Sequence, residues 1–255
     1  MRGLCATMRN ALAEVRANRA SFVSQAVVMA VNDIVWVLFW VLFFRRVGSV
    51  RGWDGHSILL LLSVITSAGG IALGLLANAR RVGSMAVDGQ LDAVLALPVP
   101  PLAHLLLRRI EPTNVGDLGF GLALFALTGQ HTLGRTAVFV GVVLASATLM
   151  TGFLVITGSL AFFLGRNEGG ELGFHALVLL GSYPVDVFAG AAKVVLYTIV
   201  PAAFVSSVPA RLIEDFDLLE AVVLATVAAT FAVGAWATFT MGLRRYTSGS
   251  VWTRS

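Results

Sequence analysis

Four ionisable side chains lie inside apolar stretches of this sequence, where a charge is costly. They are Asp33, Asp117, Asp186 and Lys193. Such groups in a membrane either line a substrate path or pair with polar groups on neighbouring helices, and the second role is favoured here. Asp186 and Lys193 are the strongest pathway candidates. On one continuous helix, seven residues separate them by about 10 Å along the axis, which excludes a direct bond.

Other chemistry has no residues to support it. A P-loop needs a glycine-rich loop ending in Gly-Lys-Ser/Thr, but the only lysine, Lys193, lies in the apolar segment GAAKVVL. Cys5 is the only cysteine, so no internal disulfide and no cysteine metal cluster can form. The histidines are scattered without ligand spacing: His56, His104, His131 and His175. The sequence therefore predicts no catalytic site, no metal and no cofactor bound by this chain.

The composition indicates an all-α integral membrane protein with a single transmembrane domain over 1–255. Of the 255 residues, 57% are hydrophobic and 13% are charged, and the mean hydropathy is +0.85. Several apolar runs reach the length of about twenty residues that a transmembrane helix needs. The net charge is +4, but the arginines cluster at the ends of apolar runs, as topology signals do, and nucleic-acid binding is not expected.

Six transmembrane helices are predicted, preceded by an amphipathic helix over 1–22 lying on the lipid surface. In that helix an apolar stripe runs beside arginines spaced by seven residues, although a frayed basic tail is the alternative. The fourth span is long and must tilt or project, and prolines break the fifth. The predicted spans are 24–44, 57–77, 113–129, 136–164, 172–200 and 219–241.

The distribution of arginines predicts that both termini are cytoplasmic, in a bacterial cytoplasmic membrane. With that orientation more arginines lie inside than outside. The inner set is Arg2, Arg9, Arg16, Arg19, Arg80, Arg81, Arg108, Arg109, Arg166, Arg244, Arg245 and Arg254. The outer set is Arg45, Arg46, Arg51, Arg135 and Arg211, of which the first three form a discordant group.

The third and fourth spans are rich in small residues. Small side chains let helix backbones approach closely in lipid, where no hydrophobic force drives association. We therefore expect tight helix contacts at some of these positions: Gly116, Gly119, Gly121, Gly141, Ala145, Thr148, Gly152 and Gly158.

The cytoplasmic loop over 78–112 is too long for a turn and carries a short amphipathic helix. Asp88 suits the cap of that helix, Asp92 suits its first turn, and Pro98 stops it. Its apolar face consists of Leu91, Val94, Leu95 and Leu97. This face either docks into the groove of a partner or packs on the helix ends of the chain itself.

The end of the fifth span is irregular. Pro201 and Pro209 bracket an apolar segment, and broken backbone at membrane depth must be buried in protein or line a cavity. An ordinary extracellular loop is the alternative.

Several motifs, in order, resemble those of type-2 ABC exporter permeases. The segment GQLDAVLALPVPPL is similar to their G-x-L-(D/E)-x-x-L-x-x-P segment. A branch with paired permease genes, the ABC-2 family transporter proteins, is closer still, with Gly52-Trp53, Tyr183-Pro184 and a late VPAAF segment followed by Pro209. The resemblance covers about 50–215. The chain departs from the pattern at Gln90 and Ala96, where acidic and basic residues are frequent.

The resemblance implies an exporter permease that moves a hydrophobic or amphipathic substrate out of the cytoplasm. A dimer of a separate ABC ATPase would bind ATP and Mg, and a second, related permease chain would complete the pathway. Residues 89–97 would form the coupling helix, through Gly89, Leu91, Asp92, Val94, Leu95 and Pro98. Residues 201–217 would form an outer re-entrant hairpin with gate candidates Pro201, Phe204 and Pro209. An ATPase-independent carrier or a membrane scaffold is the competing interpretation.

Overall fold

The structure is a computed structural model that describes residues 2–17, 19–129, 131–165 and 168–246. Within these residues the chain is helical and has no strand, apart from an isolated bridge between Val50 and Trp53, so the all-α prediction is confirmed. Arg166 and Arg254, which were counted as inner arginines, lie outside the described residues.

The helices follow one another with short connections. In chain order the first half contains α1 (Arg2–Ala17), α2 (Arg19–Val47), α3 (Gly55–Gly69), the π-helix η1 (Gly70–Leu75), the 3-10 helix η2 (Ala77–Arg81), α4 (Val82–Val87), α5 (Asp92–Leu95), α6 (Pro101–Leu107) and α7 (Pro112–Leu127). The second half contains α8 (Leu133–Ser159), α9 (Ala161–Leu164), α10 (Glu168–Gly181), η3 (Val185–Val187), α11 (Ala191–Thr198), the π-helix η4 (Ala203–Ser207), α12 (Val208–Glu214) and α13 (Leu218–Leu243).

Four helices among the described residues are long and apolar enough to cross a membrane. They are α2, α3 continued by η1, α8 continued by α9, and α13, and the bent pair formed by α11 with η4 and α12 raises the number to five. The predicted third and fifth spans correspond to α7, with 16 residues, and α10, with 14, which fall short of about twenty. Six spans therefore stay a prediction. The N-terminal helix ends at Ala17, short of residue 22, because α2 begins at Arg19.

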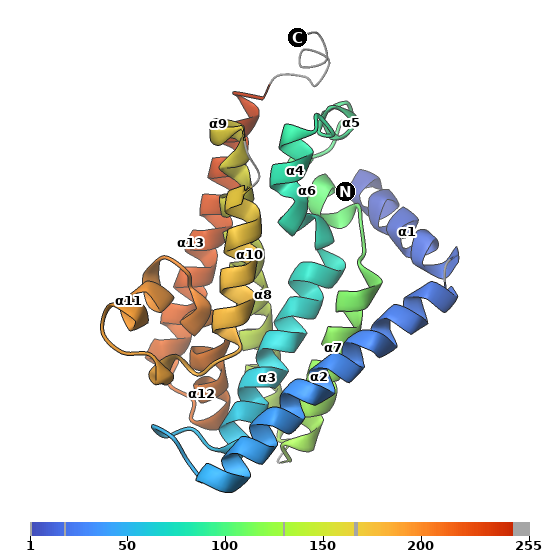
Figure 1. The fold of residues 1–255 in the computed structure, drawn as a ribbon. Helices are drawn as coiled ribbons and strands as arrows, with labels where there is room; N and C mark the ends of the chain where they lie inside the picture. The colour runs from blue at the N-terminus through green and yellow to red at the C-terminus, as the bar shows by residue number, and fades with distance from the viewer. Residues whose placement is uncertain (1, 18, 130, 166–167, 247–255) are drawn as a thin grey trace.

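The two central helices are α3 and α8, which pack on each other (Figure 1). α7 packs on α3 and α2, while α13 and α10 pack on α8. Small residues make two of these contacts possible. A Cβ on Gly152 would lie 2.8 Å from the carbonyl oxygen of Phe231 on α13, and one on Gly121 would lie 2.3 Å from the Ser67 hydroxyl on α3. The predicted close approach is confirmed at these two glycines, whereas Gly119 and Gly141 face open space.

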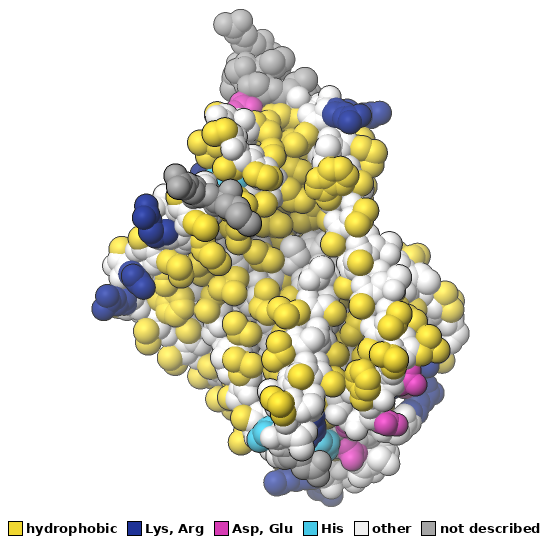
Figure 2. Space-filling model, turned by 180° about the vertical axis from the view of Figure 1, so that it is seen from behind, with side chains coloured by type: hydrophobic (Ala, Val, Ile, Leu, Met, Phe, Trp, Pro, Cys, Tyr) yellow, Lys and Arg dark blue, Asp and Glu magenta, His cyan; other side chains and the backbone are white. Residues whose placement is uncertain are grey.

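The ends of the bundle differ in content. α1, α5, α6, α9 and the end of α13 lie at one end, and the loop after α2 lies at the opposite end (Figure 1). Apolar side chains cover the middle of the face shown in Figure 2, and the charged ones gather at its margins. In both α2 and α13 only 17% of the most apolar window is buried, as lipid-facing helices require. The chain is therefore a multi-pass integral membrane protein.

Candidate functional site

The loop between α3 and α7 folds into short helices at one end of the bundle. α4 ends at Val87, and Gly89 has a left-handed φ of +70°, which glycine adopts without steric cost. α5 is a single turn, Asp92–Leu95, without a side-chain cap. The sequence expectation is wrong in two respects: Asp88 follows α4 instead of capping α5, and only this turn of the stretch 89–97 is α-helical.

The apolar face of this loop is divided between the interior and the surface. Leu91 and Val94 are fully buried in the main core. Leu95 and Leu97 are 40% and 45% exposed. Leu91 and Val94 thus pack on the chain's own helices. Leu95 and Leu97 are not fully covered by the residues that the structure describes and can contact a partner.

Contacts from three directions hold the loop. The amide of Asn78 donates to the carbonyl of Leu105 at 2.8 Å, which ties η2 to α6. The Thr7 hydroxyl and His104 Nδ1 lie 2.8 Å apart and join α1 to α6. Beyond α13, burial and then the nearby Asp92 side chain raise the pKa of the Tyr246 phenol to about 12, so the residues that follow α13 lie close to α5.

The buried contact between α1 and α6 is sensitive to protonation. Burial of His104, and then the charge of Arg108, lower the pKa of the imidazole below its usual 6.5. A cavity of about 640 Å³ lies beside it, between α1 and the loop, and its lining includes Thr7, Leu97 and Pro98. Pro98 follows the end of α5, as predicted. It lies across this cavity from α1.

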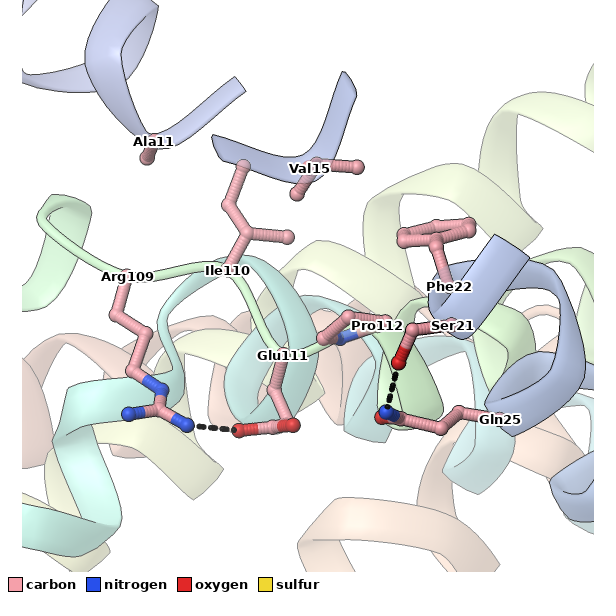
Figure 3. Close-up of a pocket in the computed structure, with 9 residues that line it drawn as sticks. All are labelled: Ala11, Val15, Ser21, Phe22, Gln25, Arg109, Ile110, Glu111 and Pro112. Atoms are coloured by element: carbon pink, nitrogen blue, oxygen red, sulfur yellow. Dashed lines mark hydrogen bonds and ion pairs between the residues drawn. The ribbon is translucent and has the colours of Figure 1, made fainter. Parts of the chain in front are cut away.

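Residues 109–112, which lead from the loop into α7, lie against the junction between α1 and α2. A crevice of about 210 Å³ there is lined by residues of α1, α2 and 109–112 (Figure 3). Arg109 pairs with Glu111 at 3.1 Å, and the Glu111 backbone N–H donates to the carbonyl of Gly74 at 2.8 Å. The Thr113 hydroxyl donates to Gln25 at 3.0 Å. The start of α7 is thus bonded both to α2 and to the end of α3.

A cluster around Asp186, which lies just after α10, connects four segments of the chain. Lys193 Nζ donates to Asp186 Oδ1 at 2.7 Å, and Trp53 Nε1 donates to Oδ2 at 2.9 Å. Arg211 also pairs with Oδ2, and Arg51 donates to the Asp186 backbone carbonyl at 2.6 Å. One carboxylate thereby joins the loop after α2 to η3, α11 and α12.

The direct bond between Asp186 and Lys193 contradicts the sequence expectation. The estimate of about 10 Å assumed one continuous helix. Instead Pro184 precedes the short turn η3, and Gly190, with a φ of +57°, reverses the chain before α11. The broken backbone therefore folds the two side chains onto each other.

The loop after α2 supplies a third cation to this cluster. Arg51 has a φ of +50°, a conformation that costs a non-glycine residue about 1 kcal/mol or more. The tight turn is closed by the bridge between Val50 and Trp53, and the Arg211 guanidinium lies 5.7 Å from the Trp53 ring centroid. The discordant outer arginine Arg51 thus has a local partner.

The gate candidates lie in a buried, bent segment. α11 and the helix Ala203–Glu214 meet at 67° around Pro201. Pro201 and Pro209 are buried, and the rings of Phe204 and Tyr197 meet edge to face at 5.4 Å. The Val185 N–H donates to the Ser207 hydroxyl at 2.9 Å, so part of the irregular backbone is satisfied inside the protein, as lipid requires.

Asp33 and Asp117 come together within the bundle, apart from the Asp186 cluster. Both line a cavity of about 170 Å³ between α2, α3, α7, α8 and α10. They are 7% and 6% exposed, and the Asn114 amide donates to Asp117 Oδ2 at 3.4 Å.

Several structural contributors were not singled out from the sequence. Trp53 was noted only as part of a motif and Arg211 only as an outer charge, and neither His104 nor Tyr246 was assigned a role. Periodicity cannot pair residues on different segments. The prolines around Asp186 were the one available signal that these charges lie off a regular helix.

The apolar helices define the class of the chain as a multi-pass membrane protein. A family model described as ABC-2 family transporter protein matches residues 30–250. The chain therefore belongs to the ABC-2 transporter family, whose members are permease components of transporters, and the resemblance drawn from its motifs is confirmed. The searches of curated proteins and of solved structures found no match.

Proposed function

We propose that this chain is the transmembrane permease subunit of an ABC exporter, driven by a separate ATPase. It would move a hydrophobic or amphipathic substrate out of the cytoplasm. The observation that carries the proposal is that Leu95 and Leu97 are partly exposed on a loop held by contacts with the rest of the chain. The chain belongs to the ABC-2 family. A helical turn with exposed leucines suits a groove on a partner.

The partner would be a dimer of ABC ATPase subunits that binds ATP and Mg. The residues at the contact would be the turn Asp92–Leu95 with Leu97 and Pro98, while Gly89, Leu91 and Val94 would hold the turn in place. A second, related permease chain would complete the pathway, because one chain carries one such loop.

The topology would comprise six spans in a bacterial cytoplasmic membrane, with both termini and residues 78–112 in the cytoplasm. α7 and α10 would be short third and fifth spans of about 24 and 21 Å. Residues 201–217 would then form an outer re-entrant hairpin, gated by Pro201, Phe204 and Pro209. The bend of 67° and the burial of both prolines support this interpretation.

Purification from the native membrane tests the proposal. The tagged full-length chain, extracted in mild detergent, should bring down a nucleotide-binding subunit. Proteoliposomes of that complex should transport only with ATP and Mg. Purification without any ATPase, together with ATP-independent transport, would favour a carrier, and a chain that transports nothing in either preparation would favour a scaffold.

A further inference from the structure

The cavity that holds Asp33 and Asp117 lies deep in the bundle. Asp33 is the central residue of the 29-residue α2, so it is as far from one end of that span as from the other. Asp117 comes from the second turn of α7. The described lining contains no lysine, arginine or histidine, so these two carboxyl groups have no cationic partner there.

Each carboxyl group has one oxygen that is buried and without a hydrogen-bond partner. These atoms are Asp33 Oδ2 and Asp117 Oδ1. Leaving a buried acceptor unsatisfied is costly, and the cost is greatest for an ionised carboxylate in a membrane. Because Asp33 and Asp117 line the same cavity, an ammonium group that reached both carboxyl groups would supply N–H donors and a positive charge to these oxygens.

The rest of the lining suits an apolar body attached to that charge. Trp36 and Phe120 contribute aromatic rings, and aromatic faces attract ammonium groups. The Phe174 ring also lines the cavity, but it is occupied by the Arg80 guanidinium at 4.7 Å from its centroid and is not available to a ligand cation. The volume of about 170 Å³ is close to that of a protein cavity of about 150 Å³ that holds benzene. One small ring or short alkyl group with an ammonium would fit.

We propose that the cavity between α2, α3 and α7 binds the ammonium group of a monovalent organic cation through Asp33 and Asp117. This gives the substrate class for the exporter. It rests on the proposed function only as far as transport is concerned, because binding needs no ATPase. Thr66 and Ser182, which also line the cavity, donate to carbonyls of their own helices and keep lone pairs for the ligand.

Thermal unfolding of the full-length chain in lipid nanodiscs tests the site with benzylammonium as the probe. Saturating benzylammonium should raise the melting temperature, because a ligand that binds only the folded state stabilises it. Benzyl alcohol, which has nearly the same shape without the charge, should give no comparable rise. Asp33→Asn and Asp117→Asn should each weaken benzylammonium binding at least tenfold, and Trp36→Leu about threefold.

The melting temperature of each Asn variant without ligand shows whether it is folded, and the ligand-induced rise is measured relative to that value. Glu214→Gln, which changes an exposed carboxylate elsewhere, should bind like the original chain. If benzyl alcohol stabilised the chain as much as benzylammonium does, the cavity would bind only the apolar ring. If sodium chloride did so, the cavity would bind an inorganic ion. Either result, or full affinity in Asp33→Asn, overturns the proposal. The co-purification of an ATPase is a separate readout, so failure of one is distinguishable from failure of the other.

Discussion

The double substitution Leu95→Ser and Leu97→Ser tests whether the exposed half of the loop face receives the ATPase. The two side chains are 40% and 45% exposed, so roughly that fraction of their apolar area is left to be buried by a partner. Full burial of a leucine is worth about 1.5–3 kcal/mol, which gives about 1 kcal/mol for each residue on docking. A loss of about 2 kcal/mol corresponds to roughly thirtyfold weaker binding.

The permease itself should lose about 1–2 kcal/mol of stability for each leucine, because more than half of each residue is already buried, so the melting temperature of the variant is measured before its ATPase affinity. The assay is titration of the nanodisc-bound permease with its purified ATPase, followed by ATP hydrolysis coupled to transport. Leu133→Ser is the matched control, since this leucine is 89% exposed and lies at the start of α8. Original ATPase affinity in the double variant, with loss in the control, would refute the reasoning.

The buried neighbour Leu91 gives the complementary result in the same experiment. Leu91 has no exposed area, so Leu91→Ser leaves a cavity and a buried hydroxyl. Large-to-small changes of this kind cost about 2–5 kcal/mol of folding stability. If Leu91→Ser unfolded at the same temperature as the original chain, Leu91 would not pack in the core. The assignment of Leu91 to the buried half of the loop face would then be wrong.

Three further predictions concern other parts of the fold. Asp186→Asn should lower the free energy of unfolding by about 2 kcal/mol, because it removes two ion pairs whose cations are about 40% exposed and hence partly screened; thermal unfolding measures it. Gly152→Val should destabilise by about 1–3 kcal/mol in urea titration, because its Cβ would meet the Phe231 carbonyl oxygen. Acidification below pH 6.5 should weaken the packing of α1. Because the pKa of His104 is lowered in the folded state, the stability that neutral His104 contributes is complete above pH 6.5 and is progressively lost below it. The fluorescence of a label on the exposed Cys5 measures this change.

Each of these has a matched control. Asp215→Asn alters an exposed carboxylate close to the same cluster and should leave the melting temperature unchanged. Gly141→Val adds the same isopropyl side chain on the same helix, where nothing lies within 4 Å of the added Cβ, and should be tolerated. In His104→Gln the fluorescence of the label should no longer depend on pH between 7 and 5. A persistent pH dependence there would assign the titration to another group.

Features that depend on composition and local pattern could be predicted from the sequence. The apolar runs set the positions of α2, α3, α8 and α13, because only a helix satisfies its own backbone in lipid. Gly152 was identified as a close-contact position because small residues recur on its span. Even here Gly141, with the same residue type, faces open space, since the pattern does not say which face meets a neighbour.

Features that depend on breaks in the chain could not be predicted in this way. Helical spacing placed Asp186 and Lys193 apart, yet the turn at Gly190 brings them to 2.7 Å. The same limit applied to the loop face, where four apolar residues looked equivalent. Burial of Leu91 and exposure of Leu95 depend on tertiary packing, in which Leu91 joins the main core and Leu95 does not.

The end of α3 next to the loop over 78–112 is irregular. Its regular hydrogen bonding gives way to the π-helix η1 and then η2, and such breaks often mark hinges. The Gly74 carbonyl in this break accepts the N–H of Glu111, so α3 and α7 are bonded together just where the loop leaves and returns. Farther along, α3 packs against η4 and α12, which carry the buried Pro209 and the Arg211 of the Asp186 cluster. One buried helix, α3 continued by η1, therefore contacts both η2 at the start of the loop and the bent segment of η4 and α12.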